Sequence, residues 1–237
     1  MSLRTWAAWG VHLYTGIGAP VALIALVASG QGWFGVAFAC MTIATFIDAT
    51  DGQLARRVNV KQVLPQFDGA RLDDIVDYLN YVVVPIVVAY QAGLLPASYW
   101  GLAIASAPLI ASGYGFAHED AKTADAASNY FFTGFPSYWN IVVFYLYAFS
   151  WPIAVNVFIL LALSVLVFVP IRYLYPSRST IARGTTYVLG TAWALMMVAL
   201  LFQFPQPSVP LALASLFFPI YYVGLSLYVH FNSPAPA

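Results

Sequence analysis

The sequence predicts an all-α, polytopic integral membrane protein with about eight transmembrane helices. Of its 237 residues, 62% are hydrophobic and 8% are charged, whereas a soluble domain carries about 25% charged residues. Apolar runs long enough to cross a bilayer core, about 20 residues each, follow one another along the chain. They leave no room for a separate soluble domain, so we expect residues 1–237 to form a single transmembrane domain.

The predicted spans are separated by short segments rich in glycine, proline or charge. They cover residues 11–28, 33–51, 72–92, 98–116, 137–150, 152–172, 185–204 and 209–229. The first follows a segment whose Arg4 and Trp6 are typical of a membrane interface. Glycines turn the chain into the second span, which is expected to fray into a charged loop after Asp51. Asp68 is expected to cap the third helix.

The later spans are divided by proline and by polar segments. A turn at residues 93–96 leads into the fourth span, and a polar stretch at 118–129 follows it. Trp151 and Pro152 divide the fifth span from the sixth, because one unbroken helix over residues 137–172 would be about 50 Å long. That length exceeds a bilayer core of about 30 Å. A basic loop at 172–183 precedes the last two spans.

The distribution of basic residues supports eight spans. With the N-terminus inside, every Lys and Arg falls on the cytoplasmic side, in agreement with the positive-inside rule. These residues are Arg4, Arg56, Arg57, Lys61, Arg71, Lys122, Arg172, Arg178 and Arg183. Joining the fifth and sixth helices would move the last three to the outside. All nine carboxylates fall on the same face as the basic residues.

Composition also disfavours several classes of protein. The formal net charge is zero, which argues against nucleic acid as a partner. The single cysteine, Cys40, lies within the second span and has no partner for a disulfide within the chain. Residues 1–30 resemble a secretory signal, but further spans follow at once, so we expect the first span to remain as an anchor.

Most of the charge lies in one stretch, residues 48–77, which holds six of the nine carboxylates and four of the nine basic residues. Asp48 and Asp51 end the second predicted span, while Asp73 and Asp77 begin the third. Each pair has a spacing that places both side chains on one helix face. If the two helices pack antiparallel, four carboxylates converge at one membrane surface. An all-oxygen group of this kind suits Mg²⁺ or Mn²⁺ rather than zinc.

The residues around these carboxylates suggest chemistry at phosphorus. Two divalent cations bridged by shared carboxylates are common at sites of displacement at phosphorus. Gly52 and Gly69 would let a bulky ligand approach the backbone closely. Arg56, one turn after Gly52, could donate to a phosphate. Arg57 and Lys61 are more typical of charges that orient a span.

The stretch resembles the CDP-alcohol phosphotransferase family, whose pattern is D-x2-D-G-x2-A-R, a spacer usually of eight residues, then G-x3-D-x3-D. All eight fixed positions are present: Asp48, Asp51, Gly52, Ala55, Arg56, Gly69, Asp73 and Asp77. The spacer here, residues 57–68, has twelve residues. It is similar to that of the bacterial branch that makes phosphatidylcholine. So are the segments GVHLYTGIGAP, GFPSYWN and RYLYPSR.

The resemblance implies a specific enzyme. It would transfer the phosphatidyl group of CDP-diacylglycerol to choline and release CMP, using two divalent cations, Mn²⁺ or Mg²⁺. The implied metal ligands are Asp48, Asp51, Asp73 and Asp77, and the implied CDP contacts are Gly52, Ala55, Arg56 and Gly69. Asp77 would also take the proton from the choline hydroxyl. The resemblance further implies a homodimer in the bacterial inner (cytoplasmic) membrane, with the active site facing the cytoplasm and the bilayer holding the lipid substrate.

Choline carries a quaternary ammonium without N–H donors, so aromatic rings or a carboxylate must hold it. Tyr138 and Trp139 begin the fifth predicted helix and face the same compartment as Asp77, so we expect them to contact choline. The aromatic belt found at membrane interfaces is a simpler explanation of the same residues.

Other functions remain open at this point. A related transferase could use serine, glycerol phosphate or inositol phosphate, and Arg172, Arg178 or Arg183 could bind a phosphorylated acceptor. A cation-coupled transporter would place its site near the bilayer midplane, often between repeated halves. Here the charge lies at one face and no repeat is visible. A scaffolding protein would leave the clustered carboxylates unexplained.

Overall fold

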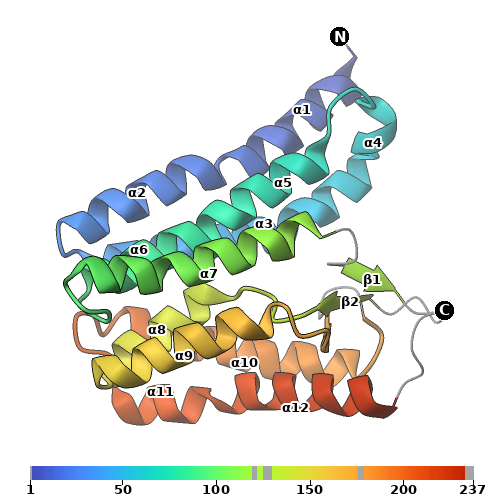
Figure 1. The fold of residues 1–237 in the computed structure, drawn as a ribbon. Coiled ribbons are helices and arrows are strands. Elements are labelled where there is room, and N and C mark those ends of the chain that lie inside the picture. The colour runs from blue at the N-terminus through green and yellow to red at the C-terminus, as the bar shows by residue number, and fades with distance from the viewer. Residues whose placement is uncertain (1, 119–121, 125–129, 176–178, 233–237) are drawn as a thin grey trace.

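The computed structural model describes residues 2–118, 122–124, 130–175 and 179–232, and its helices lie side by side in a long bundle (Figure 1). In chain order the elements are α1 (Leu3–Gly16), α2 (Gly18–Gly30), α3 (Phe34–Val58), α4 (Val60–Val63), α5 (Gly69–Asp77), the π-helical segment η1 (Tyr78–Val83), α6 (Val84–Gln91), α7 (Tyr99–Ala117), β1 (Lys122–Ala124), β2 (Tyr130–Thr133), α8 (Trp139–Phe149), α9 (Ile153–Leu166), β3 (Arg172–Leu174), α10 (Arg183–Leu201), α11 (Val209–Ser215) and α12 (Phe217–Asn232).

The helices confirm the predicted all-α, polytopic membrane fold. Within the described part of the chain, five helices are long and apolar enough to cross a membrane: Leu3–Gly30, Phe34–Val58, Tyr99–Ala117, Arg183–Leu201 and Val209–Asn232. Trp139–Phe149 and Ile153–Leu166 are shorter apolar helices. Large hydrophobic side chains such as Phe46 and Val188 point outward, as lipid-facing positions require. The total of eight spans stays a prediction.

The predicted break between the fifth and sixth helices is confirmed. α8 ends at Phe149, and Ser150 adopts the left-handed conformation with φ of 48°. Pro152 then stands immediately before α9, where its fixed φ and missing N–H favour a helix start.

The predicted fraying after Asp51 is wrong, because α3 continues as a regular helix to Val58. The residues after Asp51 are mostly good helix formers, and Arg56 and Arg57 in the last turn complement the helix dipole. The helix ends at Asn59, which is left-handed with φ of 55°. Asp48 and Asp51 are therefore held on a rigid helix.

The segments predicted as loops around residues 118–129 and 172–183 contain strands, which is a second correction. β1, β2 and β3 form a three-stranded antiparallel sheet in that order. Phe131 of β2 faces Leu174 of β3 in the register, although the two residues are far apart in sequence. The sheet lies at the end of the bundle where α3 ends and α5 begins (Figure 1).

Three hydrophobic clusters hold the described helices and strands together. The largest joins the middle helices through buried residues such as Phe38, Val82 and Leu160. Another joins the sheet to α12 through Phe131, Leu174 and Val229. A smaller cluster packs Ala8 and Val11 of α1 against Val60 of α4 and the following Leu64. The four-residue helix α4 lies within the twelve-residue spacer, so this part of the spacer is a packed element that ties α3 to α1.

Candidate metal centre

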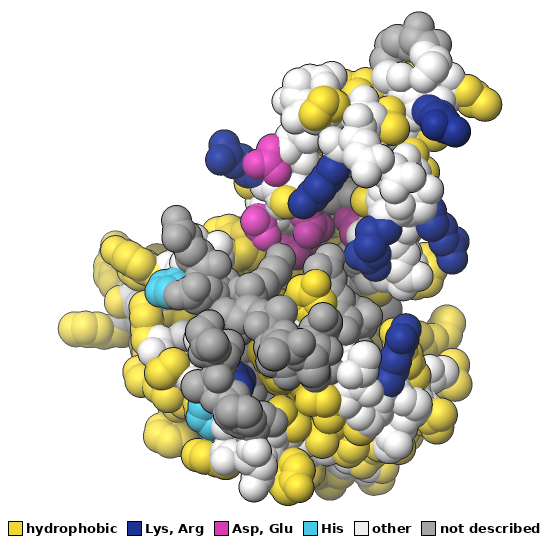
Figure 2. Space-filling view, turned by 90° about the vertical axis from the view of Figure 1, so that its right-hand side faces the viewer, with side chains coloured by type: hydrophobic (Ala, Val, Ile, Leu, Met, Phe, Trp, Pro, Cys, Tyr) yellow, Lys and Arg dark blue, Asp and Glu magenta, His cyan; other side chains and the backbone are white. Residues whose placement is uncertain are grey.

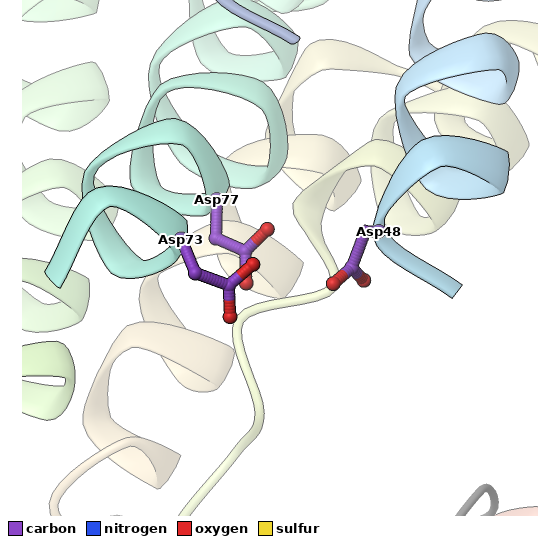
Figure 3. A group of neighbouring side chains, drawn as sticks. All are labelled: Asp48, Asp73 and Asp77. Carbon is purple, nitrogen blue, oxygen red and sulfur yellow. The ribbon is translucent and has the colours of Figure 1, made fainter. Parts of the chain in front are cut away.

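Three carboxylates converge between the second half of α3 and α5. Asp48 projects from α3 toward Asp73 and Asp77 of α5 (Figure 3). Each residue offers one oxygen, and these three oxygens lie within 4.8 Å of one another. All three side chains are half-buried, so the cluster is held next to apolar packing while remaining reachable from outside.

Asp51 lies in the same cavity but outside this group of three. It is buried, with 6% of its surface exposed. Its Oδ2 accepts a hydrogen bond of 2.7 Å from Thr15 Oγ1, which holds the carboxylate toward α1. The structure therefore brings all four predicted ligands to one cavity, three of them in mutual contact range.

A tyrosine hydroxyl orients one member of the group. Tyr81, in η1, donates a hydrogen bond of 2.8 Å to Oδ2 of Asp48. Tyr81 also lines the carboxylate cavity. Neither Tyr81 nor Thr15 was singled out from the sequence, because a single Tyr or Thr in an apolar helix carries no distinctive signal.

The π-helical segment η1 follows directly after Asp77. Its Asn80 is buried, and the Asn80 side-chain amide donates to the carbonyl oxygens of Gly18 and Val76, both at 3.0 Å. A Cβ on Gly18 would lie only 2.4 Å from Val76 Cγ1, so a glycine is needed for α2 to approach α5 this closely. Segments of π-helix are frequent at functional sites, and here the contacts fix the carboxylate-bearing helix against α2.

The predicted cap of the third span is confirmed. Asp68 Oδ1 accepts a hydrogen bond of 3.1 Å from the backbone N–H of Arg71. Gly69 follows, and a Cβ there would lie 2.5 Å from Cε1 of His12. His12 is buried, and its Nε2 has no hydrogen-bond partner among the described residues. Gly69 thus makes room for an imidazole ring, a packing role that the motif alone did not reveal.

The other predicted CDP contacts lie beside the carboxylates on α3. A Cβ on Gly52 would lie 3.3 Å from Arg56 Nη1, so the exposed guanidinium rests over this glycine. Ala55 packs against the cluster that contains Val60 and Leu64. Gly52 and Arg56 are therefore placed for a ligand, whereas Ala55 is used in helix packing.

Tyr138 and Trp139 occupy different environments. Trp139 is fully buried, and its Nε1 donates to Ser112 Oγ at 2.8 Å, so the expected contact between Trp139 and choline has no support in this structure. Adjacent side chains at a helix start point in different directions. Tyr138 is half-buried, and its ring centroid is 6.3 Å from that of Tyr81, the residue that donates to Asp48.

Arg172 and Arg183, two of the arginines considered for phosphorylated acceptors, contact other parts of the fold. Arg172 is buried and its Nη2 donates to the carbonyl oxygen of His230 at 3.0 Å, which ties β3 to the end of α12. Arg183 begins α10 and stacks over Tyr187, 5.5 Å from the ring centroid. Arg178 lies outside the described residues.

The donor set fits a hard divalent cation. Three carboxylates held within 4.8 Å would repel one another strongly without a compensating charge. Within the described ranges, no histidine or cysteine joins the group. Oxygen-only ligands suit Mg²⁺ or Mn²⁺ better than zinc or copper. The residues present therefore fit the divalent cation that their pattern predicts.

The three clustered carboxylates and the motif at residues 48–77 are features of a known enzyme family. The model of the CDP-alcohol phosphatidyltransferase family matches residues 13–221, and the chain belongs to that family.

Named relatives are similar over most of the chain. The phosphatidylcholine synthase of Legionella pneumophila is 40% identical, covering 95% of this chain and 88% of the relative. That of Legionella bozemanae is 41% identical, covering 81% of this chain and 87% of the relative. That of Rhizobium meliloti is 36% identical, covering 84% of this chain and 81% of the relative. The resemblance seen in the motif therefore extends over the helices on both sides of it.

Proposed function

We propose that this chain is a phosphatidylcholine synthase, which transfers the phosphatidyl group of CDP-diacylglycerol to choline and releases CMP. The observation that carries the proposal is the group formed by Asp48, Asp73 and Asp77, in a chain similar over most of its length to proteins of that name. A transporter is less well supported, because the clustered carboxylates are confined to the motif at residues 48–77 and no repeat is visible in the sequence.

The four carboxylates Asp48, Asp51, Asp73 and Asp77 would hold two divalent cations, Mn²⁺ or Mg²⁺. When bound, such ions neutralise pyrophosphate charge and stabilise the departing phosphate oxygen. Thr15 and Tyr81 each occupy one oxygen of a carboxylate, Asp51 and Asp48 respectively. That arrangement sets the direction in which the carboxylates face the cavity.

The remaining motif residues would bind the substrates. Arg56 would donate to the pyrophosphate of CDP-diacylglycerol, with Gly52 beside it, while Ala55 and Gly69 would support the CDP site through their packing against α4 and His12. Asp77 would accept the proton of the choline hydroxyl. The choline oxygen would then form a bond to phosphorus as the bond between phosphorus and the CMP oxygen breaks. Tyr138 would contact the ammonium group.

The whole chain, residues 1–237, would act as one transmembrane catalytic domain in the bacterial inner membrane. Its carboxylate end would face the cytoplasm, the source of free choline. Figure 2 looks onto this end, where basic side chains surround the acidic ones, as the positive-inside rule predicts for a cytoplasmic face. The family resemblance suggests a homodimer, which cross-linking in native membranes would test.

The deciding experiment uses membranes from cells that express this chain, supplied with labelled choline, CDP-diacylglycerol and Mn²⁺. We expect choline-dependent release of CMP, abolished in Asp77→Asn. Asp68→Asn is the matched control, because Asp68 is an exposed helix cap on the same helix and Asn caps equally well. CMP release with serine, glycerol phosphate or inositol phosphate but not with choline would contradict the proposal.

A further inference from the structure

A cluster of aromatic rings lies beside the carboxylates, and we call Tyr81, Phe132, Tyr138 and Tyr222 the aromatic cluster. Tyr138 is its centre: its ring centroid is 6.3 Å from Tyr81, 6.3 Å from Phe132 and 6.4 Å from Tyr222. The four rings come from η1, β2, the start of α8 and α12. Side chains of the sheet and of α12 thus lie close to η1, which directly follows the motif at residues 48–77.

The aromatic cluster and the carboxylate cavity share a boundary. Tyr81 belongs to both, because it lines the cavity and bonds Asp48. Tyr138 in turn contacts Tyr81 ring to ring, with centroids 6.3 Å apart. Phe132, Tyr138 and Tyr222 are half-buried, unlike the neighbouring Trp139, whose exposure is 0%. Each of these three residues therefore keeps some exposed surface, whereas Trp139 keeps none.

Hydroxyl contacts fix the orientation of two of these rings. Tyr222 donates a hydrogen bond of 2.9 Å to the carbonyl oxygen of Leu174 in β3, and Tyr81 donates to Asp48. β3 in turn pairs with β2, which carries Phe132. Because the sheet and α12 hold each other in this way, the rings need not be reordered when a ligand arrives, and preorganisation of this kind favours binding.

The chemistry of choline fits such a surface. Only two carbon atoms separate its hydroxyl from its ammonium, so a hydroxyl at Asp77 leaves the cation close by. The ammonium carries three methyl groups and no N–H, so it is bound by ring faces and not by hydrogen-bond acceptors. A cation resting on the face of Tyr138 would have Phe132 and Tyr222 as neighbours, because their ring centroids lie 6.3 and 6.4 Å from that of Tyr138.

We propose that Tyr138, Phe132 and Tyr222 bind the quaternary ammonium of choline and select it over acceptors with a primary ammonium. This inference rests on the proposed function and deepens it. It assigns acceptor specificity to β2 and α12, which lie outside the motif at residues 48–77. The sheet then has a functional reason for its place at this end of the bundle.

The test compares Tyr138→Leu, which removes the ring, with Tyr138→Phe, which keeps it. In Tyr138→Leu we expect the KM for choline to rise about tenfold or more, while the KM for CDP-diacylglycerol stays within about twofold. Tyr138→Phe should keep the choline KM within about threefold. Tyr228→Leu is the matched control, because Tyr228 is on the same helix as Tyr222 but is 67% exposed.

Tetramethylammonium gives a second readout, because it has the cation of choline without the hydroxyl that reaches Asp77. It should compete with choline in the unaltered protein and compete about tenfold less well in Tyr138→Leu. Phe132→Leu repeats the measurement if Tyr138→Leu does not fold. An unchanged choline KM, or a tetramethylammonium effect equal in all variants, would overturn the inference. Unaltered protein that releases no CMP with choline would instead overturn the proposed function.

Discussion

The hydrogen bond from Tyr81 to Asp48 offers the sharpest test of how the carboxylate group is held. Tyr81→Phe removes one hydroxyl and leaves the ring in place. The lost bond is 2.8 Å long and joins a buried tyrosine to a carboxylate. Hydrogen bonds to charged groups contribute about 1.5–3 kcal/mol, and partners that orient a metal-binding carboxylate typically change affinity or activity by about 10- to 100-fold.

We therefore expect Tyr81→Phe to raise the Mn²⁺ concentration for half-maximal activity by about 10- to 100-fold. The KM for choline should change little, because the substitution keeps the aromatic ring of residue 81. The assay is CMP release over a Mn²⁺ titration, in purified protein reconstituted with CDP-diacylglycerol.

Tyr78→Phe is the matched control. Tyr78 lies in the same π-helical segment, but its hydroxyl donates to the carbonyl oxygen of Leu109 at 2.9 Å, away from the carboxylates. Its loss should lower stability by about 1 kcal/mol without changing the Mn²⁺ requirement. If both variants shift the Mn²⁺ titration equally, or if Tyr81→Phe shifts it by less than about twofold, then Tyr81 does not orient a metal ligand.

Three further predictions use other contacts of the site. Thr15→Val, which removes the 2.7 Å bond to buried Asp51, should lower CMP release by about 10- to 100-fold at limiting Mn²⁺, while Thr15→Ser should retain it; equal activity of the two variants would contradict this role. Gly69→Ala should lower stability by about 1–3 kcal/mol, because its Cβ would meet His12 at 2.5 Å, and His12→Ala in the same chain should restore the melting temperature. A melting temperature that the second substitution does not restore would mean that the methyl group is harmful for another reason. Removal of divalent cations with EDTA should abolish CMP release, and Mn²⁺ should restore it in the unaltered protein but not in Asp73→Asn. Restoration to the same level in that variant would exclude Asp73 as a required ligand.

The features that the sequence predicted correctly depend on local spacing. Asp48 and Asp51, like Asp73 and Asp77, were assigned to common helix faces because helical periodicity is set within one turn. The break before α9 followed from Pro152, and the cap from Asp68 before a glycine. Such signals require no knowledge of how the helices pack.

The features that sequence reasoning missed depend on contacts between distant residues. β2 pairs with β3 across the whole of α8 and α9, so no short pattern could predict the sheet. Trp139 and Tyr138 are adjacent in sequence, and only the rotation of α8 against its neighbours sends one to the core and the other to the carboxylates. The role of Gly69 was incomplete for the same reason, since His12 comes from another helix.

The π-helical segment η1 after Asp77 separates α5, which carries Asp73 and Asp77, from the apolar helix α6. Each residue of an α-helix turns the following side chains by about 100°. The wider i→i+5 turn at Tyr78–Val83 holds about one residue more than an α-turn, so it sets the direction of Asp73 and Asp77 relative to α6. The direction of the carboxylates on α5 can thus be set without changing how α6 packs.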